Sequence, residues 1–195
     1  MGEPAPDGEP RRYLQRVISR IRLPLLALIL AGVAASLIAP FAGATSTRPA
    51  TYSPLLSSRE LWATVDVCNP ADQRDTVGIR GAMPGDGQAK DRMYMSFRLQ
   101  YLNPATGHWA NLLSGASPSY VAVGAAADAR QGGRSFQLVA PAAGKPAVTL
   151  RGVVDYQWRR GKAILEQAER VSTAGHKSLA GADPAGYSAA SCVIS

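Results

Sequence analysis

Histidine and cysteine are scarce in this chain, which contains only two of each among its 195 residues. A structural zinc site needs four ligands at characteristic spacings, and neither His108 nor His176 has a companion ligand near it in the sequence. The sequence also lacks the Gly-x-Ser-x-Gly, His-Glu-x-x-His and Ser-x-x-Lys motifs of hydrolases and the glycine-rich loop that binds phosphates. We therefore expect no metal site, no cofactor and no enzymatic activity.

Long runs of basic residues are also missing, although the formal net charge is +7. The chain has no zinc-finger spacing and no aromatic and basic signature of an RNA-binding sheet, so we expect no nucleic-acid partner. Five arginines precede position 23, and the residues from 45 onward contain 16 Lys and Arg against 11 Asp and Glu. This mild excess of positive charge is compatible with a weak affinity for anionic polymers of the cell envelope.

The most informative segment joins a basic stem to an uninterrupted apolar stretch. Residues 23–44 contain no charge and end in Ala42, Gly43 and Ala44, a small-x-small pattern that signal peptidase recognises, which would make residues 1–44 a signal peptide. The alternative is a retained membrane anchor, because a helix of 22 residues is about 33 Å long and a bilayer core is about 30 Å thick. In either case we expect the arginines to stay on the cytoplasmic side and residues 45–195 to be exported.

The two cysteines, Cys68 and Cys192, lie near opposite ends of the exported part. An oxidising compartment allows them to pair, and we expect a disulfide that fastens the last strand to the first. Two buried free thiols are the alternative. Residues 45–59, which contain Ser, Thr and Pro, are expected to form a spacer before a domain of residues 60–195.

Apolar residues alternate with polar ones through most of residues 60–195, which is typical of β-strands. The clearest case is residues 92–102, where one face carries Met93, Met95, Phe97, Leu99 and Tyr101. The opposite face is largely polar, so the pattern predicts a sheet with one buried side. Similar patterns predict strands at residues 61–68, 76–83, 108–113, 120–126, 134–140, 147–159 and 187–194.

Turn residues separate these strands at intervals of about ten residues. A Pro-Ala-Thr-Gly turn predicts that residues 108–113 return beside residues 92–102, and a Gly-Gly turn predicts that residues 134–140 return beside residues 120–126. Residues 162–173 have a composition that also suits a helix, but a tight turn before them favours a strand. The sequence therefore predicts an all-β, antiparallel β-sandwich, preceded by an N-terminal hydrophobic helix.

Residues 183–187, Asp-Pro-Ala-Gly-Tyr, resemble the Asp-x-Ala-x-Tyr corner of immunoglobulin-like domains, and Cys192 follows them. The resemblance implies an immunoglobulin-like or fibronectin-like sandwich. Two features depart from the family pattern: the family cysteine comes two residues after the tyrosine, where this chain has Ala189, and little sequence remains for a closing strand. The Ala, Arg and Gly bias and the terminal cysteine also resemble exported proteins of high-GC actinobacteria, which implies no activity.

Three arginines are candidates for an anion-binding surface. If their apolar neighbours face the core, then Arg80, Arg98 and Arg151 all point to the opposite, solvent-exposed side. Guanidinium groups match phosphate bidentately, so such a patch would bind anionic envelope polymer or lipid headgroups. The alternative is that three acidic residues on neighbouring strands neutralise the arginines as cross-strand pairs. These acids are Asp155, Glu166 and Glu169.

Two weaker patterns also concern ligands. Asp86 and Asp91 flank a loop that contains glycine, but their spacing lacks the alternating oxygen ligands of a known calcium loop. Trp62, Trp109 and Trp158 would form a platform for stacking sugars only if they lay together on one surface.

These observations predict an exported or secreted, extracytoplasmic β-sandwich that acts as a binding or structural module. Its expected partners are an anionic envelope polymer or another envelope protein, with membrane contact through residues 1–44 if these are not cleaved. The alternative is a secreted hydrolase or hydrolase inhibitor. Buried, partnered acids beside His108 would favour the enzyme, whereas a flat surface without a cleft would favour the module.

Overall fold

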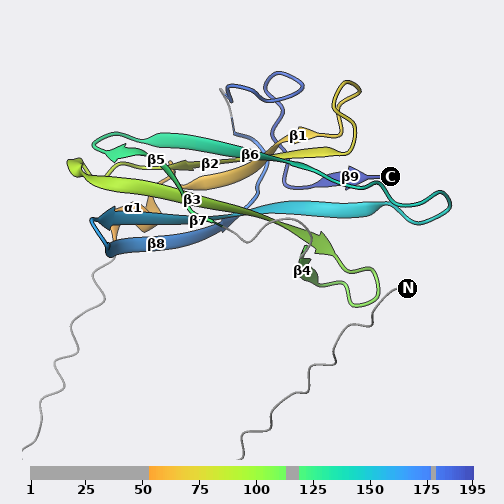
Figure 1. Ribbon diagram of the computed structural model, residues 1–195, viewed down its shortest axis with the longest axis horizontal. Helices are drawn as coiled ribbons and strands as arrows, with labels where there is room; N and C mark the ends of the chain where they lie inside the picture. Colours follow the sequence, from red (N-terminus) through yellow and green to blue (C-terminus); the bar gives the residue numbers. More distant parts are fainter. Residues whose placement is uncertain (1–52, 113–118, 177–178) are drawn as a thin grey trace, which may run out of the picture. The chain divides into compact units, whose positions relative to one another are not determined.

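Two antiparallel β-sheets face each other in the computed structural model, which describes residues 53–112, 119–176 and 179–195 (Figure 1). The described residues belong to one compact unit. The predicted leader and its helix, residues 1–44, lie outside the described residues. Within the described ranges, no helix has the length and apolar character needed to cross a membrane.

The smaller sheet has three strands in the order β1-β2-β6, with the bounds Trp62–Cys68 for β1, Thr76–Met83 for β2 and Arg130–Gln137 for β6. The first two strands form a hairpin, and β2 pairs antiparallel with β6 over its whole length. A β-bulge interrupts β1 at Asp66, because the ladder register shifts between Val65 and Val67.

The larger sheet has six strands, of which β3 (Gln88–Leu102) and β7 (Val148–Arg160) form the long central pair. Two short strands share the outer edge of β3, namely β4 (Trp109–Asn111) and β5 (Val121–Ala126). In the same way, two strands share the outer edge of β7. These are β8 (Ala163–Val171) and β9 (Cys192–Ile194).

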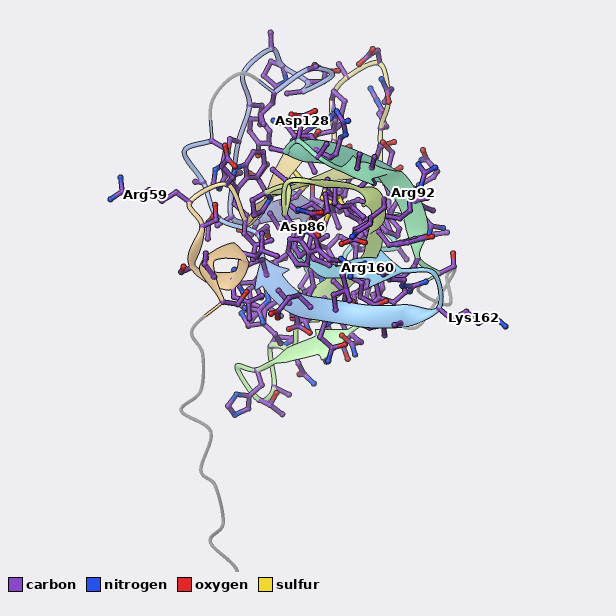
Figure 2. All side chains as sticks on the ribbon, turned by 90° about the vertical axis from the view of Figure 1, so that its left-hand side faces the viewer. Arg59, Asp86, Arg92, Asp128, Arg160 and Lys162 are labelled. Atoms are coloured by element: carbon purple, nitrogen blue, oxygen red, sulfur yellow. A yellow bond between two sulfur atoms is a disulfide. The ribbon has the colours of Figure 1, made fainter. Side chains whose placement is uncertain are left out.

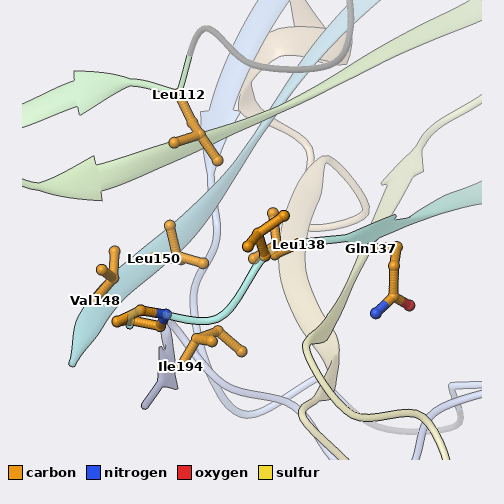
Figure 3. Close-up of a pocket in the computed structure, with 8 residues that line it drawn as sticks. Leu112, Gln137, Leu138, Val148, Leu150 and Ile194 are labelled. Carbon is orange, nitrogen blue, oxygen red and sulfur yellow. The ribbon is translucent and has the colours of Figure 1, made fainter. Parts of the chain in front are cut away.

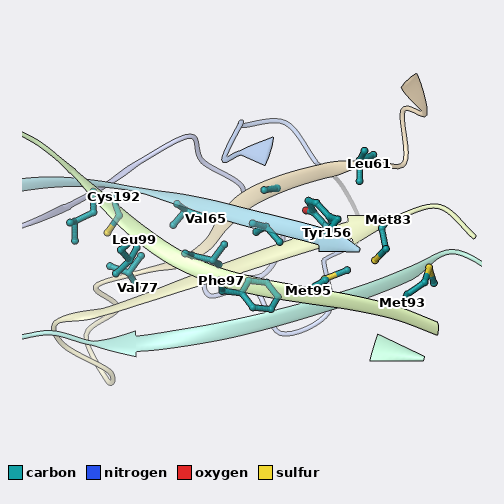
Figure 4. Close-up of a cluster of buried hydrophobic side chains, with 14 of the residues drawn as sticks. Leu61, Val65, Val77, Met83, Met93, Met95, Phe97, Leu99, Tyr156 and Cys192 are labelled. Atoms are coloured by element: carbon teal, nitrogen blue, oxygen red, sulfur yellow. The ribbon is translucent and has the colours of Figure 1, made fainter. Parts of the chain in front are cut away.

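The core lies between the sheets and is built from the apolar faces of the alternating strands (Figure 4). Four side chains of β3 are buried in it, as the alternation predicted: Met93, Met95, Phe97 and Leu99. The sheets approach closely where Ile79 packs on Gly152, because a Cβ at Gly152 would lie 2.8 Å from Ile79 Cγ2. The prediction of an all-β, antiparallel sandwich is therefore confirmed.

The hairpin predicted for residues 120–126 and 134–140 is wrong. β5 pairs with β3 in the larger sheet, whereas β6 pairs with β2 in the smaller one, so the chain crosses between the sheets after β5. The predicted turn, residues 130–133, lies inside β6. Gly132 allows β6 to pack closely on Met95 of β3, because a Cβ on Gly132 would lie 3.2 Å from Met95 Sδ. Alternation within a strand does not specify which edge the strand joins.

Residues 162–173 contain a strand, as predicted, since β8 covers Ala163–Val171. The last strand is shorter than predicted, because the described parts of residues 172–191 leave the larger sheet and run along the edge of β1. We name these parts the edge segment. They form isolated bridges with three residues of β1: Ala63, Val65 and Val67. The edge segment thus occupies backbone groups that an edge strand would otherwise leave unpaired.

A disulfide joins Cys68 at the end of β1 to Cys192 at the start of β9, with 5.5 Å between their Cα atoms. The predicted pairing is therefore confirmed. It connects the first strand of the smaller sheet to the last strand of the larger sheet.

A short helix, α1 (Pro54–Ser57), precedes β1. Leu55 and Leu56 pack against the core, and the Leu56 carbonyl accepts a hydrogen bond of 2.6 Å from Arg170 Nη2 on β8. The described end of the segment predicted as a spacer, residues 45–59, therefore contacts the domain.

Candidate functional site

The three arginines predicted to form one patch lie on two different sheets. Arg80 is on β2 of the smaller sheet, whereas Arg98 and Arg151 are on β3 and β7 of the larger one. All three face away from the core, but the outer faces of two packed sheets point in opposite directions. The structure therefore brings Arg98 and Arg151 onto one face and separates Arg80 from both, because alternation does not reveal sheet membership.

Arg80 is paired with an acid that the sequence analysis did not consider. Asp66, the residue at the β-bulge, lies 2.7 Å from Arg80, measured from Oδ2 to Nε. A Cβ at Gly78 would lie 2.7 Å from Asp66 Oδ1, so the absence of a side chain at Gly78 makes room for this carboxylate. The Asp66 side chain is 4% exposed, and the pair is therefore largely shielded from water.

Arg98 lies between two carboxylates on the outer face of the larger sheet. It forms ion pairs with Asp155 on β7 and Glu169 on β8, two of the acids considered as neutralising partners. The third acid, Glu166, lies opposite the buried Trp158 in the β7-β8 ladder, on the core side of β8. Within the described ranges Glu166 forms no ion pair.

The outer face of the larger sheet carries a set of aromatic and planar polar side chains, which we name the outer array. Its members are Tyr94, Arg98, Gln100, Trp109, Asn111, Arg151, Asp155, Gln157, Arg159 and Glu169, together with Tyr120, whose ring contacts Arg159. Beneath them, Val153 is fully buried although it lies opposite Arg98 on the face turned away from the core. The long side chains of the array therefore form a layer over the sheet.

At one end of the outer array, Arg159 is enclosed by two tyrosines. Its guanidinium lies 4.2 Å from the ring centroid of Tyr94 and 4.9 Å from that of Tyr120. Its Nε donates a hydrogen bond of 2.7 Å to Oε1 of the buried Gln157. Cation–π contacts and this hydrogen bond fix the arginine in place.

At the other end, Arg151 repeats this pattern with different partners. Its guanidinium lies 4.4 Å from the ring centroid of Trp109, and its Nε donates a hydrogen bond of 2.8 Å to Gln100 Oε1. Gln100 Nε2 then donates to Asn111 Oδ1 at 3.0 Å. Most members of the array therefore come from four strands, β3, β4, β7 and β8. The array forms because these strands pair in this register.

A hollow of about 370 Å³ opens in the outer array between these two ends, and the described residues that line it are polar except for Ala168. The other lining residues are Tyr120, Asp155, Gln167 and Glu169. Burial raises the pKa of Asp155, and this effect outweighs Arg98, which acts in the opposite direction. Burial, followed by the Asp155 carboxylate, also raises the pKa of Tyr120. The hollow is thus a partly dehydrated, acidic part of the face.

A second cavity, of about 350 Å³, lies at one end of the core (Figure 3). Among the described residues, its lining is apolar apart from Gln137, whose amide is already bonded to Thr76 and to the Arg74 carbonyl. The apolar residues are Leu112, Leu138, Val139, Pro141, Val148, Leu150 and Ile194. Leu112 is the last described residue before position 119, and nothing in the structure shows what covers the cavity. We assign it no ligand.

The three tryptophans do not form a common platform. Trp158 is fully buried in the core. Trp62 stacks on His176, with 4.1 Å between ring centroids, while Trp109 stacks with Arg151. The structure therefore contradicts the arrangement that a tryptophan platform for sugars would need, because the three rings lie in three different environments.

Where β3 begins and β7 ends, Arg160 binds the buried Asp91 through two hydrogen bonds of 2.7 and 2.8 Å. Figure 2 views this end of the sheets, with Arg160 and Asp86 labelled. The hydrogen bond from Arg160 lowers the pKa of Asp91, whereas burial raises the pKa of Asp86. Arg160 thus occupies both carboxylate oxygens of Asp91, the atoms that a calcium ion would need as ligands. The described ranges contain no group of side chains that could hold a metal ion.

We expect the pair of Asp91 and Arg160 to stabilise the protein more at neutral pH than in acid. The pKa of Asp91 is lower in the folded protein than its ordinary value of 3.8. The pair therefore stabilises the fold fully above about pH 4, and this contribution is lost as the pH falls through the folded-state pKa. Asp91→Asn is expected to weaken the pH dependence of the free energy of unfolding, measured with urea between about pH 2 and pH 7.

The matched control for this measurement is Asp128→Asn. Asp128 is an exposed acid whose contact with Arg130 is 3.9 Å long. Exposed pairs of this kind contribute little, so the pH profile of the control is expected to follow that of the unaltered protein. If Asp91→Asn also leaves the pH dependence of the free energy of unfolding unchanged, the predicted contribution of the pair of Asp91 and Arg160 is wrong.

No family model, no curated protein and no solved structure matches this chain. The interpretation of the outer array therefore depends on its geometry. Sequence alternation placed Tyr94, Arg98 and Gln100 on one face of a strand, but it did not reveal their partners. Those partners come from other strands, and only the register of the sheet brings them together.

Proposed function

We propose that this chain is a non-enzymatic binding module that recognises another protein of the cell envelope through its outer array. One observation carries the proposal: the array gathers one tryptophan, two tyrosines and three arginines on a single sheet face. Trp, Tyr and Arg are the residues most enriched at the energetic centres of protein interfaces.

Contacts within the outer array support this role because they order its side chains in the unbound protein. Arg159 is held by two tyrosine rings and Gln157, and Arg151 is held by Trp109 and Gln100. Side chains that are already ordered lose less conformational entropy when a partner binds. Such an arrangement favours recognition of one specific surface over general adhesion.

The aromatic residues of the outer array favour a protein over an anionic envelope polymer. Its three arginines lie beside two acids, Asp155 and Glu169, and the exposed Arg92 opposite Arg159 adds one more positive charge to the same face. Three of these four arginines are already engaged, because Arg98 is paired with both acids and Arg151 and Arg159 stack on aromatic rings. Arg80, the third member of the predicted patch, is paired with Asp66 on the other sheet. An envelope protein is therefore the better supported of the two expected partners.

The strand order supports an immunoglobulin-like arrangement as part of this proposal. If β1, β2 and β6 are lettered A, B and E, and β3, β7 and β8 are lettered C, F and G, the sheets have the A-B-E and C-F-G orders of that fold. The motif at residues 183–187 gives no support, because it follows β8, whereas the family's tyrosine corner precedes strand F. The proposal of an immunoglobulin-like arrangement therefore depends on the strand order and not on this motif.

The proposed location is outside the cytoplasm, with residues 1–44 as the export segment, either cleaved or retained as an anchor. The disulfide between Cys68 and Cys192 supports this location, since such bonds persist mainly in oxidising compartments.

The proposal of a non-enzymatic role is supported by two side-chain arrangements. Within the described ranges, the ring of His108 makes no hydrogen bond or ion pair. Asp155 and Glu169, the two carboxylates that face each other across a hollow, are both engaged by Arg98. A hydrolase would instead need an acid or base free to exchange a proton with the substrate.

Affinity capture from intact envelopes, with the full-length chain as bait, tests the proposed function. The double variant Tyr94→Ala/Trp109→Ala is expected to reduce capture of the bound protein by at least tenfold, because hot-spot side chains contribute about 2 kcal/mol or more each. The control is Gln131→Ala/Ser135→Ala, which changes two exposed residues of β6 on the smaller sheet. Unchanged capture by the array variant, or capture of polysaccharide alone, would refute the proposal.

A further inference from the structure

We infer that Arg92 and Arg159, at one end of the outer array, bind a carboxylate that an acidic side chain of the protein partner presents. The inference rests on the proposed function and deepens it, because it names the chemical group that the partner places at this end of the interface. Three features of the two arginines support it: their positions in the sheet, the charges around them and the hydrogen-bond donors that they leave unused.

Arg92 and Arg159 are cross-strand neighbours on one face of the larger sheet. Arg92 on β3 lies directly opposite Arg159 on β7 in the ladder. Both belong to the face turned away from the core, because Met93 and Trp158, which alternate with them, are fully buried. Like charges directly opposite each other are unfavourable. A bound anion relieves this repulsion.

The row of side chains that contains the two arginines has no acid. The residues beside them are Ala125 on β5 and Ile164 on β8, which are both apolar. The only acid of β7 is Asp155, which lies four positions from Arg159 and therefore about 13 Å away along the strand. The Asp155 carboxylate is paired with Arg98. The outer face thus supplies no acid for this pair of arginines.

Two acids do lie at this end of the sheets, but other cations occupy them. Asp91 is buried on the core side of β3, and both of its carboxylate oxygens accept hydrogen bonds from Arg160. This bond, with a smaller effect from Lys90, lowers the pKa of Asp91. Asp86 lies beside the pair, where burial, followed by the Asp91 carboxylate, raises its pKa. These two acids therefore face two cations of their own.

The positive charge on the outer side of this end is therefore uncompensated. Within the described ranges, Arg92, Arg159 and Lys162 form no ion pair. Lys162 lies in the turn between β7 and β8 and projects into solvent (Figure 2). Arg98, in the middle of the outer array, is instead paired with two acids. An anion is therefore attracted to this end of the array and not to its middle.

Arg159 offers unused hydrogen-bond donors in a fixed orientation. The rings of Tyr94 and Tyr120 enclose its guanidinium, and its Nε donates to Gln157. Its two terminal nitrogens form no hydrogen bond with any described residue. A guanidinium can donate two parallel hydrogen bonds to one carboxylate, so these nitrogens fit both oxygens of an acidic side chain. Arg92 is exposed, so the carboxylate can reach the pair from solvent.

NMR titration of the full-length chain with Nα-acetyl-L-glutamic acid α-amide tests the inference, with the ring signals of Tyr94 and Tyr120 as the readout. We expect both signals to shift as the probe binds. The uncharged probe Nα-acetyl-L-glutamine amide is expected to bind at least tenfold more weakly, because a charged hydrogen bond is worth about that factor.

Two variants test the roles of the two arginines. Arg92→Gln is expected to weaken binding of the charged probe by about threefold, since an exposed charge contributes modestly. Arg159→Lys keeps the charge but removes the fork of two donors, and it is expected to weaken binding by about tenfold.

Arg134→Gln is the matched control, because Arg134 also stacks on an aromatic ring, that of Phe136, but lies on the smaller sheet. Its affinity for the charged probe is expected to equal that of the unaltered protein. Thermal unfolding of the three variants checks that any loss of binding does not arise from unfolding.

The outcomes separate this inference from the proposed function. Equal binding of the two probes, no binding of the charged probe, or affinities in Arg92→Gln and Arg159→Lys equal to that of the control would overturn the carboxylate site. Inorganic phosphate that binds tenfold more tightly than the charged probe would assign the arginines to phosphate groups and would also overturn it. If Tyr94→Ala/Trp109→Ala abolishes capture of the partner while the charged probe fails to bind, the proposed function stands and the inference is wrong. Binding of the charged probe without capture of any protein would refute the proposed function and leave the carboxylate site in place.

Discussion

Replacing both cysteines by alanine is expected to lower the free energy of unfolding by about 2–5 kcal/mol. Cys68 and Cys192 are 124 positions apart, and a cross-link that closes so long a loop removes much conformational freedom from the unfolded chain. In the folded protein the bond holds β9, which pairs with β7 through only three residues. The alanine variant therefore loses the main covalent restraint on the end of the chain.

Urea unfolding of the full-length protein, with and without a reducing agent, measures this effect. The reduced, unaltered protein is expected to unfold at the same urea concentration as the double alanine variant, because both lack the cross-link. The variant itself is expected to show no response to the reducing agent. A loss below about 1 kcal/mol would contradict the expectation that closing this long loop stabilises the protein, since native disulfides in domains typically contribute more.

Phe97→Ala is expected to lower the free energy of unfolding by about 3–5 kcal/mol, because it leaves a cavity between two packed sheets. The Phe97 side chain is 2% exposed and points into the core from the centre of β3. Gly132, on the opposite sheet, lies close to its ring, since a Cβ there would be 3.7 Å from Phe97 Cζ. A rigid backbone at this distance cannot collapse easily into the space that the ring leaves.

The matched substitution is Gln100→Ala, on the same strand and the opposite face. Gln100 accepts a hydrogen bond from Arg151 and donates one to Asn111, but both partners remain accessible to water. The expected loss is below about 1 kcal/mol, because water replaces such bonds. Chemical unfolding of the two variants under one condition gives the comparison. Similar losses at the two positions would show that the faces of β3 are assigned incorrectly.

The alternation of apolar residues was sufficient to predict the strands and the buried face of β3. This succeeds because a sheet with one side in the core requires a period of two, and residues 92–102 follow that period closely. The tight turn at Arg160 and Gly161 was sufficient to prefer a strand over a helix at residues 162–173. The disulfide could be predicted because the chain contains no other cysteine.

Sheet membership could not be predicted from the sequence. The pattern in β2 and β3 shows that Arg80 and Arg98 both face away from the core, but it contains no information on which strands are neighbours. The same lack of information led to the wrong pairing of β5 and β6. Asp66 was not considered as a partner of Arg80, because a bulge that redirects one side chain leaves no periodic signal.

The layer of arginine side chains over the larger sheet gives β7 two covered sides. Val153 is fully buried and Gln157 nearly so, although both lie on the face turned away from the core. Tolerance to substitution is therefore expected to differ between strands of the same protein. The outward positions of β6 face solvent, as at Gln131 and Ser135, and can accept many residue types. In β7, a replacement on either side meets packed neighbours, so this strand is the least suitable place for introducing labels, tags or new charges.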